Sequence, residues 1–200
     1  MSRILIVTPL ISIALLITGC SSSETENKSP SASSTPRPPS ISVSVKPAPT
    51  QYNQGRQSIN FDPCTNVSDT VVSQAGFDPS TRERDDEIHD TYSFIGCKFD
   101  HKEVVRGQNV PTRTLTISST NITLDEFRKR EGISATEIKV NGRDAITYNR
   151  PDAESCFIVM KTNDGSLDVQ TSVSGPFTSE KPCDRIRDVA GLIEPTLGSA

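Results

Sequence analysis

The fold of this chain is decided by the stretch ATEIKVNGRDAITYN, which runs from Ala135 to Asn149. Two runs of strand-forming residues flank the pair Asn141-Gly142, and this arrangement is a strong signal for a β-hairpin with a two-residue turn. A second hairpin is predicted directly afterwards, where CFIVMKT and SLDVQTSV enclose the turn at residues 163–165. Adjacent hairpins pair their strands in opposite directions, so the sheet should be largely antiparallel.

Two further strands are expected before these hairpins. TYSFIGCKF has strand composition, and TRTLTISST alternates apolar and polar residues, with Leu115 and Ile117 on one face. The polar segment FDPSTRERDDEIHD, which precedes them, is expected to be a loop. The sequence therefore predicts about six strands.

Three helices are expected around the sheet. One begins near Pro63 and ends at Gly76, and a second is predicted from Leu124 to Arg130 because Thr123 and Glu126 form a capping box. The third carries apolar residues at helical spacing from residue 186 to residue 193. Amphipathic helices must cover a sheet face, so the expected fold is α+β: a largely antiparallel sheet of about six strands packed against two or three helices.

The amino terminus has the parts of a secretory signal. Arg3 precedes a short aliphatic run that contains Pro9 and is shorter than the roughly 20 apolar residues of a membrane-spanning helix. Leu16-Ile17-Thr18-Gly19-Cys20 resembles the lipobox of bacterial lipoproteins. The resemblance implies cleavage between Gly19 and Cys20 and acylation of the Cys20 thiol, which would hold the protein on the outer face of the cell membrane.

Three regions are expected along the chain. Residues 1–19 are the predicted signal peptide, and residues 20–57 are rich in Ser, Thr and Pro and should form a disordered tether. Residues 58–200 have the size of one globular domain. Without residues 1–19 the chain has 20 basic and 25 acidic residues, a net charge of −5, which argues against nucleic acid as a partner.

Four cysteines remain after Cys20 is set aside. An even number in an exported domain indicates disulfides, and four cysteines allow three pairings. The preferred pairing is Cys64–Cys97 with Cys156–Cys183, in which each bond closes a loop of about 30 residues. A zinc site would normally show paired C-x-x-C ligands, and these cysteines are scattered singly, so we expect no metal.

Short motifs carry a resemblance to a known family. FDPC at the first helix, GCKF in the first strand, a Cys in a middle strand and PCDRIRDVAGLIEPTL near the end resemble the domain of unknown function of actinobacterial cell-envelope lipoproteins, including mycobacterial Lpr proteins. The resemblance covers residues 60–197; Phe99 stands where that family often has Trp. The arrangement is also similar to the Mog1/PsbP-like fold. The family supplies no catalytic residues.

A search for catalytic motifs finds none. The chain lacks a G-x-S-x-G elbow, an H-E-x-x-H pair and a P-loop, and only His89 and His101 offer imidazole bases. The acidic run RERDDEIHD lacks the spacing of a calcium loop and is expected to be solvated. We therefore expect a protein that is not an enzyme and has no cofactor.

Three classes of function remain open. The first is a protein-interaction or adaptor module with a full core and an exposed apolar patch. The second is a carrier for an apolar or lipid-like envelope ligand, with a cavity lined by Phe94, Ile117, Phe157 and Val159. The third, a hydrolase with an unrecognised site, would show a concave pocket with perturbed titratable groups.

Overall fold

The computed structural model describes residues 39–198 and shows an α+β domain. One eight-stranded antiparallel sheet has the order β1-β3-β4-β8-β7-β6-β5, with the short β2 paired to β3. Its strands are β1 (Asp78–Arg84), β2 (Glu87–Ile88), β3 (Ser93–Val105), β4 (Gln108–Thr120), β5 (Thr136–Val140), β6 (Arg143–Arg150), β7 (Ser155–Lys161) and β8 (Ser166–Val173). The helices are α1 (Pro63–Asn66), α2 (Asp69–Gln74), α3 (Leu124–Glu131) and α4 (Ile186–Ile193), with 3-10 turns at Gly132–Ser134, Pro151–Ala153 and Glu194–Leu197.

Both predicted hairpins are present. β5 and β6 pair around Asn141-Gly142, whose φ angles of 50° and 93° are the positive values that such a turn requires. β7 and β8 pair across the Asn163–Gly165 turn. The capping box is also confirmed, because Thr123 and Glu126 cap α3 reciprocally.

Two expectations about the region before β3 were wrong. The polar segment expected to be a loop contains β1 and β2, which raises the strand count from about six to eight. The edge strand β1 was not recognised from the sequence because it is rich in charged residues. One of these, Arg82, is buried; it donates to the Cys64 carbonyl at 3.0 Å and pairs with Asp69 at 2.7 Å. The first predicted helix is instead two, α1 and α2, because the Ser68 hydroxyl caps a new helix start by accepting from Val71 N.

The globular unit also begins earlier than the expected boundary at residue 58. Residues 39–57, which we call the strap, run along the domain and are held by side chains. Ser42 N donates to Asp69 at 2.7 Å, and Arg56 pairs with Glu126 and donates to the Asn121 carbonyl. The buried Asn121 amide bonds to the strap at two further points. The remainder of the predicted tether, residues 20–38, and the predicted signal peptide lie outside the described residues.

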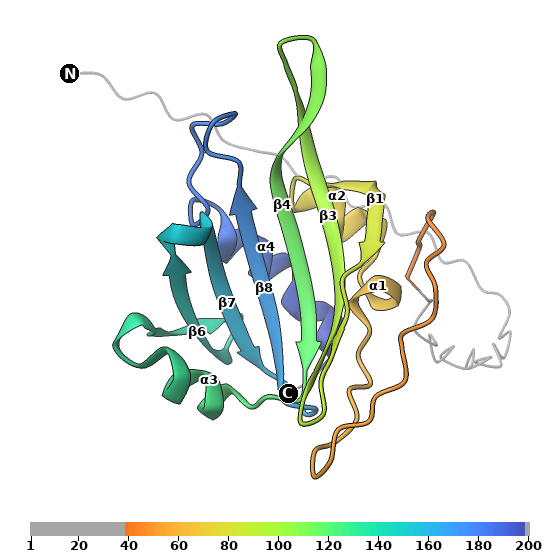
Figure 1. The fold of residues 1–200 in the computed structure, drawn as a ribbon, viewed down its shortest axis with the longest axis vertical. Helices are drawn as coiled ribbons and strands as arrows, with labels where there is room; N and C mark the ends of the chain where they lie inside the picture. Colours follow the sequence, from red (N-terminus) through yellow and green to blue (C-terminus); the bar gives the residue numbers. More distant parts are fainter. Residues whose placement is uncertain (1–38, 199–200) are drawn as a thin grey trace, which may run out of the picture. The chain divides into compact units, whose positions relative to one another are not determined.

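The two faces of the sheet differ in how they are covered. The larger core lies on one face, where Phe99, Leu115, Ile117 and Val169 pack with the apolar sides of α1, α2 and α4. On the other face Leu124 and Phe127 of α3 pack on a smaller cluster that belongs to β6 and β7. In Figure 1, α4 lies behind the sheet and α3 lies near the lower ends of β6 and β7. α3 therefore leaves part of its face uncovered.

Both disulfides have the preferred pairing. Cys64–Cys97 joins α1 to β3 and is fully buried in the larger core. Cys156–Cys183 joins β7 to the segment before α4; Cys156 is buried, whereas Cys183 is exposed. The two bonds fasten helices of the first face to the sheet at separate places.

Candidate functional site

A polar groove occupies the sheet face that α3 leaves open. We call it the sheet groove; its volume is about 330 Å³. β4 and β8 form the floor, because Thr116, Ser118, Asp168 and Gln170 alternate with core residues along these strands and point to the open face. The full lining is Asp85, Glu87, Phe94, Thr116, Ser118, Arg130, Tyr148, Arg150, Ala153, Phe157, Asp168 and Gln170.

Asp168 is the least satisfied group in the groove. Its side chain forms no hydrogen bond or ion pair within residues 39–198, and its Oδ1 atom is shielded from solvent. Burial raises the pKa of Asp168 to about 7, and Glu131 adds to the effect, while Arg130 and Arg150 oppose it. A shielded carboxyl oxygen without a partner is costly, so Oδ1 of Asp168 marks a place where a ligand can supply a missing donor.

One wall of the groove is aromatic and cationic. The Tyr148 and Phe157 rings stack at 4.7 Å, and the Arg150 guanidinium lies 5.7 Å and 5.4 Å from their centres. Arg130 and Arg150 both bond to Oε1 of Glu131, at 2.7 Å and 3.1 Å. Burial raises the pKa of Tyr148, so this phenol stays neutral. The wall offers guanidinium donors beside an apolar platform.

The opposite wall is acidic. It carries the exposed carboxylates of Asp85 and Glu87, and Glu87 lies 3.4 Å from His89. Gly96 of β3 allows this wall to approach the sheet, because a Cβ at Gly96 would lie 2.1 Å from the Asp85 carbonyl oxygen. Asp85 N donates to Gly96 O, and the Asp86 carboxylate accepts from Gly96 N, which fixes the wall in place.

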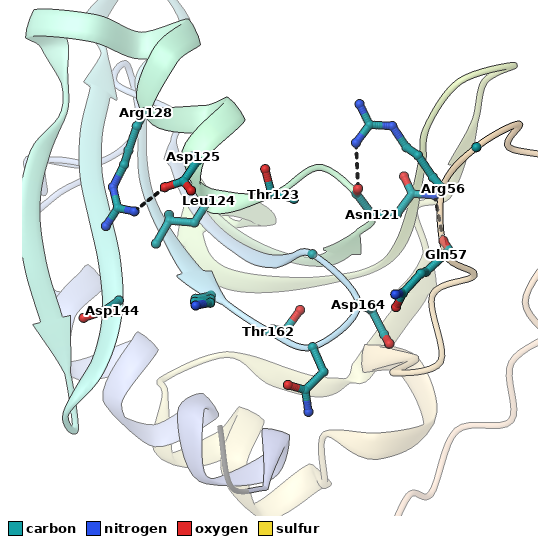
Figure 2. Close-up of a pocket in the computed structure, with 14 residues that line it drawn as sticks. Arg56, Gln57, Asn121, Thr123, Leu124, Asp125, Arg128, Asp144, Thr162 and Asp164 are labelled. Carbon is teal, nitrogen blue, oxygen red and sulfur yellow. Dashed lines mark hydrogen bonds and ion pairs between the residues drawn. The ribbon is translucent and has the colours of Figure 1, made fainter.

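A second hollow, of about 440 Å³, lies between the strap, α3 and the β7–β8 turn. Figure 2 shows Arg128 bonded to Asp125 and Arg56 bonded to the Asn121 carbonyl. Most of its charges are paired: Arg128 also binds Glu137, Asp144 binds Lys139, and Asp164 accepts from Asn60. Because its polar groups satisfy one another, this hollow is a weaker candidate than the sheet groove.

The four predicted cavity residues do not line one cavity. Phe94 and Phe157 line the sheet groove, whereas Ile117 and Val159 are fully buried in the two separate cores. The expected apolar cavity is thus replaced by a polar groove that contains two of its residues. Gly19 and Cys20, the predicted cleavage and lipidation site, lie outside the described residues.

The sequence interpretation missed Asp168, and a signal for it was present. In SLDVQTSV the apolar Leu167 and Val169 alternate with Asp168 and Gln170, which predicts that one face of β8 is exposed to solvent. The pattern does not reveal the cationic wall, because Arg130 comes from α3 and Arg150 comes from β6. Neither histidine lines the groove, since His101 bonds to the Gly76 carbonyl and Glu103 at another place.

Within residues 39–198, no group of three or more His, Cys, Asp or Glu side chains is placed to hold a metal ion. The helices of the same residues include none that is long and apolar enough to cross a membrane.

The fold and the groove define a class of protein: a disulfide-bonded α+β domain with a polar groove on one sheet face. The particular family follows from a family model that matches residues 15–196, and the chain belongs to that family, DUF3558, described as a protein of unknown function. No curated protein and no solved structure matches the chain.

Proposed function

We propose that this protein is a lipoprotein of the actinobacterial cell envelope whose domain is a non-catalytic binding module. Cleavage after Gly19 and acylation of Cys20 would anchor it on the outer face of the membrane. The two disulfides support an extracytoplasmic location, because such bonds persist in oxidising compartments. Eighteen residues separate Cys20 from the strap, so the anchored domain would stay within about 65 Å of the bilayer.

One observation carries the binding function: the unpartnered Asp168 carboxyl at the floor of the sheet groove. The groove also offers Thr116 and Ser118 hydroxyls and two arginines to a polar ligand. Its lining contains no His and no Cys, so a nucleophile with an adjacent imidazole base does not form there. The polar lining supports a polar ligand over the apolar one.

The β3–β4 hairpin supports a second candidate, the adaptor function. Its outer part, from Lys102 to Pro111, pairs only with itself and extends beyond the other strands in Figure 1. The side chain of Val104 is largely exposed on this arm, and the turn at Arg106-Gly107 adds a positive charge. Such an arm is suited to contact another envelope protein.

The anchor is tested by Cys20→Ser. The variant should leave the membrane fraction or remain unprocessed, while the wild-type protein should partition with membranes as the mature form. If Cys20→Ser still fractionates with membranes at mature mass, the lipid anchor is refuted.

The groove is tested by native mass spectrometry of the full-length chain in detergent after incubation with an envelope extract. Wild-type protein should gain mass that is lost on denaturation. Thr116→Trp, which fills the groove floor, should lose the added mass, and Thr162→Trp, which fills the second hollow, should keep it. Added mass retained by Thr116→Trp and lost by Thr162→Trp would place binding in the second hollow and refute the proposal.

A further inference from the structure

We propose that the sheet groove takes a zwitterionic ligand of the amino-acid or short-peptide class, with its ammonium on Asp168 and its carboxylate on Arg130 and Arg150. This inference rests on the binding function proposed above. A zwitterion can satisfy both charged ends of the groove, which we call the cationic pole (Arg130 and Arg150) and the anionic pole (Asp168, Asp85 and Glu87).

The cationic pole has guanidinium N–H donors that are free to bind a ligand. Arg130 and Arg150 each carry five N–H donors, and both are about half exposed, at 46% and 47% of their side chains. Their ion pairs converge on a single oxygen of Glu131. Glu131 therefore leaves most of the guanidinium edges open to a second carboxylate, which arginine binds in a fork geometry.

The anionic pole lacks donors. Asp168 can accept several hydrogen bonds and has no partner within residues 39–198, and Asp85 makes no ion pair there either. A primary ammonium carries three donors and a positive charge, so it satisfies Asp168 and is attracted by Asp85 and Glu87. The cationic pole repels a cation without an anionic group, and the carboxylates repel a ligand that is only anionic.

Size and shape agree with a small ligand. About 330 Å³ lies at the lower end of the range for small-molecule sites, roughly 300–1,000 Å³. Phe94 and Phe157 give short side chains an apolar surface, and Thr116 and Ser118 offer hydroxyls to a peptide group. A neutral sugar would use these groups but would leave both charged poles without a partner.

Binding should depend on pH. The groups that face Asp168 are Arg130 of α3 with its neighbour Glu131, Arg150 and Tyr148 of β6, and Asp85 and Glu87 of the acidic wall. Since an ammonium prefers ionised Asp168, whose pKa lies at about 7 in the free protein, affinity should rise as pH increases from 6 to about 7.5. Above that pH it should fall again, because the α-amino group of a peptide, with a pKa of roughly 7.7–8.0, loses its proton.

The test uses three matched probes: alanyl-alanine, its N-acetyl form and its C-terminal amide. The full-length chain in detergent micelles is titrated with each probe and followed by NMR chemical shifts. Alanyl-alanine should shift groove resonances saturably, and loss of either charge should weaken binding at least tenfold. Asp168→Asn should remove the preference for the free amine, and Arg150→Met the preference for the free carboxylate. Lys161→Met, in the second hollow, should behave as wild type.

Equal affinity for the three probes, or no saturable shift in the groove with any of them, overturns the zwitterion inference. The extract experiment separates this failure from failure of the binding function. If Thr116→Trp still abolishes extract-derived mass, the groove binds a ligand of another class. If wild-type protein gains no such mass and binds no probe, both proposals fail.

Discussion

Asp168→Asn tests whether the ionised Asp168 carboxylate destabilises the folded protein. The change keeps the side-chain shape and one acceptor oxygen but removes the carboxylate. Burial raises the pKa of Asp168 to about 7 in the folded protein, against roughly 3.9 in an unfolded chain. The folded state therefore binds the proton more tightly, and this stabilisation is complete below pH 3.9 and is lost as pH rises through 7.

The magnitude follows from the size of the pKa shift. About two of the three units fall between pH 5 and pH 7, which at 1.36 kcal/mol per unit sets an upper limit of roughly 3 kcal/mol. Asp168 is partly exposed, and Arg130 and Arg150 lie near it. Solvent screening should reduce the effect to about 1–2 kcal/mol.

Urea unfolding at pH 5 and pH 8 measures the effect. Relative to wild type, Asp168→Asn should gain about 1–2 kcal/mol of unfolding free energy between the two pH values. Asp152→Asn, a change at an exposed carboxylate outside the groove, should gain nothing. If the unfolding free energies of wild type and Asp168→Asn change in parallel from pH 5 to pH 8, ionisation of Asp168 does not destabilise the folded protein and the prediction is refuted.

Three other changes test the fold around the groove. Stepwise reduction should open Cys156–Cys183 before Cys64–Cys97, because only the first bond has an exposed cysteine; alkylation and mass mapping would contradict this if the bonds opened together. Gly96→Ala should cost about 1–3 kcal/mol in urea unfolding, since its Cβ would collide with the Asp85 carbonyl; unchanged stability would refute that close approach. Arg56→Ala should speed limited proteolysis within the strap by several-fold and leave the rest protected, because Glu126 and the Asn121 carbonyl lose a donor; equal cleavage rates would show that Arg56 does not hold the strap.

Local signals predicted much of the fold. The Asn141-Gly142 turn, the Thr123/Glu126 capping box and the alternation of β4 each depend on contacts within a few residues, and all three appear as expected. The disulfide pairing was also preferred correctly, because each bond closes a moderate loop. Features of this kind are encoded locally and need no knowledge of the remaining chain.

Features that depend on distant partners were missed. β1 carries charges whose ion partners lie outside the strand, Asp62 at the N-cap of α1 and Asp69 in α2, so no hydrophobic alternation revealed the strand. Residues 39–57 have the composition of a disordered tether, yet Asn121 and Glu126 hold them to the domain. Single-sequence patterns cannot show a partner that is brought close only by folding.

The sequence by itself therefore determined the hairpins, the capped helix, the cysteine framework and the α+β class, because turn chemistry and periodicity act over short distances. Tertiary structure alone decided the candidate site. It placed Arg130 of α3, Arg150 of β6 and Asp85 of the β1–β2 segment around Asp168 of β8, and it left the shielded Oδ1 atom of Asp168 without a partner. The charge and shape of the groove arise from this convergence of residues that are far apart in the chain.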